Sequence, residues 1–159
     1  MTEEAALVRL STKCVTTEYC LSDIRRKMQR WLLPEGAEER ILQRLQDERF
    51  VDESRYAHAF VRDKSRYNRW GERRIEFELR KKGISNEDIK DALTELQDDE
   101  ENDERLIALL RQKAKTVKAR NDYELMMKLL RFAAQRGFTS EQVQRCLKKA
   151  INKEFDDEA

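Results

Sequence analysis

The sequence is poor in the residues that most often form tight turns, since its 159 residues include one Pro and four Gly. Hairpins depend on Gly, Asn and Pro at defined turn positions, so this shortage excludes a protein built mainly from β-hairpins. Long apolar runs are missing too, which excludes a membrane-spanning helix, and the first residues lack the basic and apolar segments of a signal peptide. We therefore expect an all-α protein that resides in the cytoplasm.

Residue types that bind metals or attack substrates are equally scarce. The only histidine is His58, and the three cysteines, Cys14, Cys20 and Cys146, form no C-x-x-C pair. An odd number of scattered cysteines is typical of reduced thiols inside the cell. The chain also carries no phosphate-binding glycine loop, dinucleotide fingerprint or zinc-ligand spacing. We therefore expect a protein that is not an enzyme, with no catalytic residue, no metal, no cofactor and no small-molecule substrate.

Charged residues are what the chain has in excess, at 41% of the sequence against about 25% in an average domain. The charges nearly cancel to a net +1, but they are segregated locally. An acidic block spans residues 95–104, and a basic block follows at residues 111–120. With 39% hydrophobic residues, the chain is better suited to several small helical modules, each with a thin apolar seam, than to one large core.

A two-helix pattern occurs twice at a constant offset, which marks an internal repeat. The matched positions are Ile75 and Leu129, Leu79 and Ala133, Gly83 and Gly137, Ile84 and Phe138, Ser85 and Thr139, Asp88 and Gln142, Ile89 and Val143, and Leu93 and Leu147. In each copy the glycine supplies a left-handed residue that ends one helix, and a Ser or Thr caps the next as part of a capping box. Gly71 is the expected N-cap before Ile75, with Trp70 as a hydrophobic staple.

A third copy of this pattern lies nearer the N-terminus. Ile24, Met28, Ile41 and Leu45 form its seam, and Pro34 lies in an insertion between its two helices. The first of these helices is expected over residues 21–31.

A leading helix precedes each copy of the pattern. The first is expected over residues 3–13, the second begins after Asp52 as N-cap, and the third follows the acidic block. The sequence thus predicts all-α tandem three-helix repeats in an elongated, curved array of right-handed or left-handed winding. The expected modules are residues 1–49, 50–97 and 98–155, followed by a frayed tail at 156–159.

The order of these motifs resembles the RecX regulatory proteins, which modulate the bacterial recombinase RecA. The resemblance is carried by residues 50–61 (FVDESRYAHAFV), 71–79 (GERRIEFEL), 82–84 (KGI) and 136–138 (RGF). Residues 20–28 (CLSDIRRKM) resemble the family's S-x-x-E-L-x-x-K-L, with Cys20 in the place of Ser, and Asp52-Glu53 stands where the family has Asp-Asp. The resemblance implies tandem three-helix repeats that dock into the groove of RecA filaments on DNA. It further implies suppression of strand exchange and ATP hydrolysis, in DNA recombination, DNA repair and the SOS response.

The candidate binding residues are Lys and Arg side chains in three groups. A strip around Tyr67 and Trp70 contains Arg66, Arg69, Arg73, Arg74, Lys81 and Lys82. An interhelix connection carries Lys113, Lys115, Lys118 and Arg120, and a smaller group consists of Arg25, Arg26 and Lys27. Such groups bind phosphates through counterion release, or an acidic protein surface. Solvated helix faces, and cations placed at helix C-termini, are the structural alternatives.

Two functions from different classes remain open on these grounds. The first is a regulator that binds the RecA filament through its modules and reaches phosphate through its basic residues. The second is a helical module that binds single-stranded or duplex DNA without RecA, independently of base sequence. The near-zero net charge argues against the second, because binding to bare DNA depends on positive charge. A scaffold for another partner is also compatible with the repeats.

Overall fold

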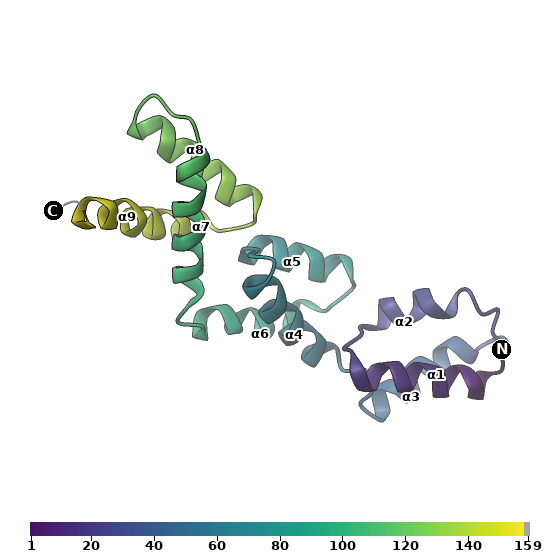
Figure 1. Cartoon of the computed structure of the whole chain (residues 1–159). Helices are drawn as coiled ribbons and strands as arrows, with labels where there is room; N and C mark the ends of the chain where they lie inside the picture. The colour runs from purple at the N-terminus through teal and green to yellow at the C-terminus, as the bar shows by residue number, and fades with distance from the viewer. Residues whose placement is uncertain (158–159) are drawn as a thin grey trace. The chain divides into compact units, whose positions relative to one another are not determined.

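The computed structural model describes residues 1–157, with side chains as far as Ile151, and folds this range into nine helices and no strand (Figure 1). The helices are α1 (Glu3–Thr16), α2 (Leu21–Met28), α3 (Ala37–Asp47), α4 (Glu53–Arg66), α5 (Glu72–Lys81), α6 (Asn86–Asp98), α7 (Asn102–Thr116), α8 (Asp122–Gln135) and α9 (Ser140–Asp157). Within the described range the all-α prediction is confirmed. Helix α9 continues into the predicted frayed tail as far as Asp157, and the rest of that tail lies outside the described residues.

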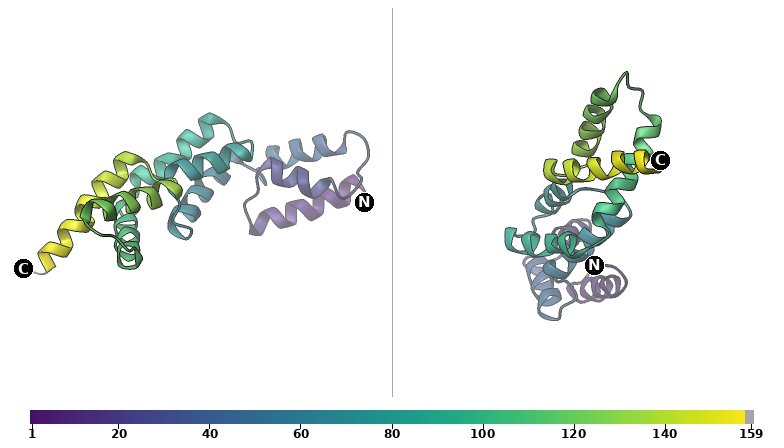
Figure 2. Two further views of the ribbon diagram at one scale, coloured as in Figure 1. Left: turned by 90° about the horizontal axis from the view of Figure 1, so that it is seen from above. Right: turned by 90° about the vertical axis from the view of Figure 1, so that its left-hand side faces the viewer.

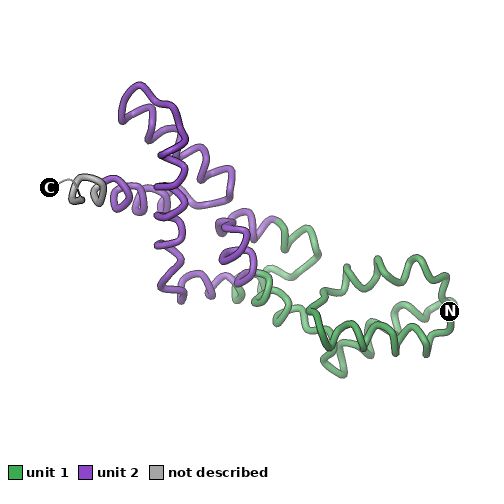
Figure 3. Tube along the Cα trace, viewed as in Figure 1, with its two compact units in different colours: residues 1–60, 78–92 green, residues 61–77, 93–159 purple. Residues whose placement is uncertain are grey.

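The helices belong to two compact units (Figure 3). The first unit comprises residues 1–60 and 78–92, and the second comprises residues 61–77 and the chain from Leu93 onward. The division passes through α4, α5 and α6, so each of these helices contributes to both units. The module boundaries expected from the sequence stay a prediction.

The first unit has its apolar core among the three N-terminal helices, where α3 lies beside both α1 and α2 (Figure 2). The core contains the predicted seam together with residues of α1; its fully buried members are Ala6, Leu10, Ile24, Met28, Ile41, Leu45 and Val51. Residues at i and i+4 of a helix share one face, which is how Ala6 and Leu10, and Ile24 and Met28, reach the same interior. The seam expected for this copy is thus buried.

Two helix ends differ from the sequence-based expectation. Helix α2 ends at Met28 rather than Trp31, and Leu32 adopts a left-handed φ of 48°. Pro34 restricts the residue before it to extended conformations, so the chain must leave the helix early to reach it. Helix α1 continues to Thr16, past the expected end at Lys13, and the Thr16 hydroxyl donates to the Lys13 carbonyl at 3.1 Å.

The second unit has its core among α7, α8 and α9. Its buried residues are Leu106, Leu109, Leu110, Leu129, Ala133, Phe138, Val143, Cys146, Leu147 and Ala150. The list includes every apolar position that the repeat assigned to this copy, from Leu129 to Leu147. The repeat pattern therefore identified the buried faces of α8 and α9 correctly.

The capping residues predicted from the repeat are present. Gly83 and Gly137 have left-handed φ values of 81° and 93°. The Ser85 hydroxyl accepts from the Asp88 N–H at 3.1 Å, and Thr139 accepts from Gln142 at 3.3 Å. The Gln142 side chain, however, donates to Asp103 at 3.1 Å. The left-handed glycines and the Ser85 and Thr139 caps are thus confirmed, whereas the Gln142 side chain bonds Asp103 and does not return to the cap as a capping box requires.

Candidate functional site: two helix junctions and a basic hollow

The middle helices of the repeats meet end to end, and the first such junction lies in the first unit. The Ser22 hydroxyl, at the start of α2, donates to the carbonyl of Lys82 at the end of α5 (2.8 Å). The Lys82 ammonium in turn donates to the Asp23 carboxylate at 3.0 Å and forms an ion pair with it. Burial works to raise the pKa of Asp23, but hydrogen bonds from Lys82 and Cys20 outweigh it, and the pKa lies below its ordinary value. Lys82, a candidate binding residue, is thus paired within the protein.

The second junction lies in the second unit and joins the start of α5 to the turn after α8. The Gly71 N–H donates to the Arg136 carbonyl at 2.8 Å, and the Arg73 N–H donates to the Gly137 carbonyl at 2.9 Å. The first N–H groups of a helix and the last carbonyls of another lack partners within their own helices. Here the N–H groups at the start of α5 donate to the carbonyls after α8, so both sets of groups gain partners. The partial charges of these two helix ends are also of opposite sign.

Only glycine fits at the point of closest approach in this second junction. A Cβ on Gly71 would lie 2.3 Å from the Phe138 nitrogen, and one on Gly137 would lie 2.5 Å from the Cβ of Arg74. Gly71, expected only as an N-cap, is therefore also a packing residue.

The Trp70 ring is engaged by cations of the protein itself. The Arg74 guanidinium lies 4.1 Å from the ring centroid and the Lys64 ammonium 4.9 Å from it. These distances are within the range of cation–π attraction. Arg74, a candidate binding residue, is therefore partly held by Trp70, although both Arg73 and Arg74 are exposed.

A basic hollow lies beside the second junction. We call it the Arg136 hollow; it is lined by Arg69, Leu109, Gln112, Lys113, Thr116, Phe132 and Arg136. The Lys113 ammonium and the Arg136 guanidinium each lie 5.0 Å from the Phe132 ring centroid. The hollow thus brings together Arg69 and Lys113, which the sequence analysis placed in separate groups, and adds Arg136. The signal that could have found Arg136 is its position in the repeat, equivalent to Lys82.

Among the residues with described side chains, no group of three or more His, Cys, Asp and Glu is arranged to hold a metal ion. Over that same part of the chain, no helix combines the length and the apolar character that crossing a bilayer requires.

Two protein-family models match the part of the chain that contains the second junction. The model described as "RecX, second three-helix domain" matches residues 52–93, and the one described as "RecX, third three-helix domain" matches residues 99–147. The chain belongs to the RecX family. The family expected from the sequence motifs is thus confirmed.

Relatives of known sequence carry the name "Regulatory protein RecX". The one from Clostridium botulinum (strain Eklund 17B / Type B) is 30% identical over 115 residues, which cover 71% of this chain and 53% of that protein. The one from Neisseria meningitidis serogroup A is 33% identical over 121 residues, covering 75% and 73% of the two chains. The chain thus spans about half the length of its two Clostridium botulinum relatives.

Solved RecX structures share the fold. The crystal structure of a regulatory protein RecX has a TM-score of 0.76 and 26% identity, over 92% of this chain and 71% of that one. RecX from Lactobacillus salivarius has a TM-score of 0.82 over 94% and 96% of the two chains, and its 18% identity supports a likeness of fold alone. The predicted all-α fold of tandem three-helix repeats is confirmed.

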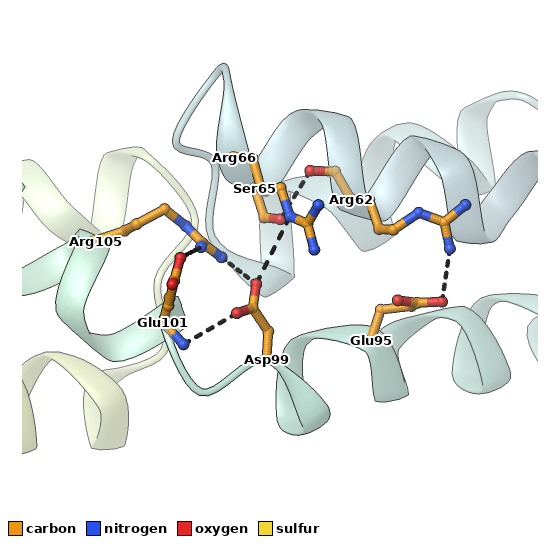
Figure 4. A network of polar contacts seen from close by, with 7 residues as sticks. All are labelled: Arg62, Ser65, Arg66, Glu95, Asp99, Glu101 and Arg105. Carbon is orange, nitrogen blue, oxygen red and sulfur yellow. Dashed lines mark hydrogen bonds and ion pairs between the residues drawn. The ribbon is translucent and has the colours of Figure 1, made fainter.

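Several other candidate cations of this RecX family chain form ion pairs. In the second unit Arg66 lies 4.0 Å from Asp99, which also pairs with Arg105, as Figure 4 shows. The hydrogen bond from Arg105 leads the causes that hold the pKa of Asp99 below its ordinary value. In the first unit Lys81 lies 3.9 Å from Glu78. These contacts are partly or largely exposed to solvent, where ion pairs contribute about 0–1 kcal/mol.

The group expected at an interhelix connection is divided, because α7 extends to Thr116 and includes Lys113 and Lys115 in its last turn. Only Lys118 and Arg120 lie in the connection after α7. Of the four candidates, Lys113 alone lines the Arg136 hollow. Lys115 and Lys118 are exposed, while Arg120, 92% exposed, lies 3.9 Å from Glu124.

The N-terminal group is similarly divided. Arg25 pairs with Glu39 at 2.6 Å, and the Lys27 ammonium lies 5.0 Å from the Tyr19 ring centroid. Arg26 and Lys27 also line a second basic hollow, together with Arg9, Lys13, Arg30 and Trp31.

Proposed function

We propose that this chain regulates a RecA recombinase by binding the filament that RecA forms on DNA. The observation that carries the proposal is membership of the RecX family, whose relatives are named regulatory proteins. Most of the candidate cations lie within the two matched three-helix domains. The expected effect is to inhibit or modulate RecA ATP hydrolysis, strand exchange and filament growth in recombination, DNA repair and the SOS response.

The surface chemistry is compatible with this mode of action. A filament on DNA offers phosphates and protein carboxylates, and both attract exposed Arg and Lys side chains. Cations of the second unit, such as Arg69 and Arg73, are exposed and form no ion pair among the described residues. A regulator of this kind acts by occupying a surface and by altering the stability of the assembled filament, so its effect follows from binding alone.

The Arg136 hollow supports a second candidate function, in which the chain binds single-stranded or duplex DNA without RecA. Unpaired cations that converge on one hollow are typical of sites for the DNA backbone. Under this alternative, binding to bare DNA is tight and falls steeply as salt is raised.

The test is to titrate the protein into RecA that hydrolyses ATP on single-stranded DNA, and to measure its own binding to that DNA at low and physiological salt. Under the filament proposal, inhibition occurs at amounts well below those of RecA, while binding to bare DNA is weak. If the protein leaves RecA unaffected and binds DNA tightly with a steep salt dependence, the second candidate replaces the first. If neither effect is seen, both candidates are wrong.

A charge-reversal pair locates the surface used. Arg73→Glu with Arg69→Glu is expected to weaken inhibition, because both side chains are exposed cations of the second unit. Lys90→Glu with Arg131→Glu removes the same charge from exposed positions outside the candidate groups and serves as the matched control. Equal inhibition by the two double variants would exclude Arg69 and Arg73 from the interface.

A further inference from the structure

The two helix junctions occupy equivalent places in the repeat, but within the described part of the chain only the cation of the first junction has a carboxylate partner. Lys82 and Arg136 are related by the constant offset between the two copies of the pattern. Lys82 forms an ion pair with Asp23. Arg136 forms no ion pair among the residues whose side chains are described; its contact is with the Phe132 ring.

The reason for the difference lies in the residue that takes the place of Asp23. Ile24 and Ile75 are equivalent positions, so the counterpart of Asp23 at the second junction is Arg74. The second junction therefore has a cation where the first has a neutralising carboxylate. Cations brought close together repel each other, and an anion placed between them removes this cost.

Three cations line the Arg136 hollow without a carboxylate partner in the described chain: Arg69, Lys113 and Arg136. Helices α7 and α8 both end near the hollow. The negative ends of their dipoles stabilise positive charge there, which explains in part why Lys113 and Arg136 occupy these positions. They do not account for Arg69, which lies in the connection between α4 and α5. Arg69 has a left-handed φ of 55°, a conformation that is unfavourable for residues other than glycine and typical of functional sites.

The second junction fixes the loop that carries Arg69 to the backbone of Arg136. Gly71, two residues after Arg69, donates its N–H to the Arg136 carbonyl at 2.8 Å. Arg69 and Arg136 are thus held beside one another by backbone contacts that do not depend on their side chains.

We propose that the Arg136 hollow binds a phosphate group. A phosphate offers several oxygens to converging donors, and guanidinium groups bind it with paired hydrogen bonds. The Gln112 amide lines the same hollow and is a further donor. Phe132 already contacts Lys113 and Arg136, so the hollow takes the phosphate rather than a base. This inference deepens the proposed function and rests on it for the source of the phosphate, which is the nucleic-acid backbone.

The test compares binding of a fluorescent oligothymidylate by the full chain and by single variants. Arg69→Gln, Lys113→Gln and Arg136→Gln are each expected to weaken binding by about tenfold, the effect of losing one charged hydrogen bond. Each loss also lowers the salt slope by about one. Arg136→Lys, which keeps the charge, retains part of the affinity. Arg131→Gln removes an exposed cation of α8 outside the hollow and keeps the affinity of the unaltered chain.

If the Arg136 variant does not fold, Arg69→Gln still tests the proposal. Arg69 lies in the connection between α4 and α5 and its side chain is exposed, so the substitution is expected to leave the fold intact. Binding that is unchanged in Arg69→Gln and Lys113→Gln overturns the proposal, as does a failure of the unaltered chain to bind the oligonucleotide. Competition with poly-glutamate distinguishes a phosphate site from a site for any anion. If poly-glutamate displaces the oligonucleotide at an equal concentration of negative charge, the hollow is not a phosphate site. Displacement by ATP at low concentration supports a phosphate site whose source is a free nucleotide.

The same variants separate this inference from the proposed function. If the unaltered chain does not affect RecA ATP hydrolysis but loses oligonucleotide binding in the hollow variants, the proposed function fails and the phosphate site stands. If the hollow variants bind the oligonucleotide as the unaltered chain does while inhibition of RecA persists, the phosphate site fails and the proposed function stands.

Discussion

At the scale of single residues, two glycines with the same backbone conformation have different surroundings. Gly83 and Gly137 both have left-handed φ values, but a Cβ added to Gly83 would meet nothing within 4 Å. A Cβ on Gly137 would meet the backbone and Cβ of Arg74 at 2.5 Å. The same sequence signal thus marks a solvent-exposed helix end in one copy and a packed junction in the other.

Replacing each glycine by Ala separates the two contributions. Gly83→Ala is expected to lower the free energy of unfolding by about 1 kcal/mol, the cost of a left-handed conformation for an L-residue. Gly137→Ala is expected to cost about 1–3 kcal/mol more, because the added methyl group overlaps a neighbouring backbone. Urea denaturation of both variants measures the difference. Equal losses would show that the close approach to Arg74 has no energetic consequence.

The repeat offset revealed the left-handed conformation of both glycines but not their unequal packing. A helix followed by Gly and then by a Ser or Thr three residues before an acid or amide is a local pattern, and local sterics decide it. What Gly137 touches depends on a helix more than fifty positions earlier in the chain, which no local pattern encodes. For the same reason the sequence identified Arg69 and Lys113 as candidates but could not bring them to one hollow.

Glu53 supplies a second prediction at the residue scale. Burial, together with the charges of Asp88 and Asp23, raises its pKa from 4.5 to about 7. One of its carboxylate oxygens is buried and accepts no hydrogen bond among the described residues. Between these pH values the folded protein holds a proton that the unfolded chain has lost. The stability associated with protonated Glu53 is therefore complete below pH 4.5 and falls as the pH rises toward 7.

The variant Glu53→Gln removes this titration. Its free energy of unfolding is expected to decline less than that of the unaltered chain between pH 4.5 and about 7, and to exceed it above that range. Urea denaturation at several pH values measures both curves, with Glu87→Gln, an exposed acid of α6, as the control for loss of a surface charge. Parallel curves for Glu53→Gln and the unaltered chain would refute the burial of a carboxylate with a raised pKa.

At the scale of helices, the end-to-end junction is the device that joins neighbouring modules. In each junction, donors from the start of one middle helix reach carbonyls at the end of the next, although the donor is a Ser22 hydroxyl in the first and backbone N–H groups in the second. Because unpaired backbone groups at a buried helix end are costly, each module completes its neighbour. The sequence revealed that the modules repeat, but the capping interactions it predicted were all local.

The variant Gly71→Ala tests the second junction directly. The φ of Gly71 is not left-handed, so the substitution adds no backbone strain, and its cost reports on packing alone. A Cβ 2.3 Å from the Phe138 nitrogen forces the start of α5 away from the turn after α8, with an expected loss of about 2 kcal/mol or more. Faster amide hydrogen exchange at position 71 and at Arg73 would accompany it. Unchanged stability and exchange would mean that the two backbones do not meet.

At the scale of the whole molecule, a net charge of +1 conceals an unequal division of usable positive charge. The candidate cations of the first unit are largely engaged, since Arg25, Lys81 and Lys82 form ion pairs there. In the second unit Arg69 and Arg136 form none within the described chain. A partner with negative charge therefore gains more from the second unit, because it need not displace an existing carboxylate.

Under the proposed function, this difference predicts unequal losses of RecA inhibition. Removing two cations of the second unit, with Arg69→Gln and Arg136→Gln, is expected to raise the concentration for half-inhibition of ATP hydrolysis by about tenfold or more. Removing two cations of the first unit, with Arg25→Gln and Lys82→Gln, is expected to change this concentration by less than about threefold. Both double variants are assayed at a temperature at which each remains fully folded. If both double variants raise the concentration for half-inhibition by the same factor, the two units contribute equally to filament binding. Linked sites multiply each other's affinity, so loss of either site then weakens the whole. A larger loss from the first pair of ion-paired residues would instead mean that the partner breaks the Lys82 and Asp23 contact on binding.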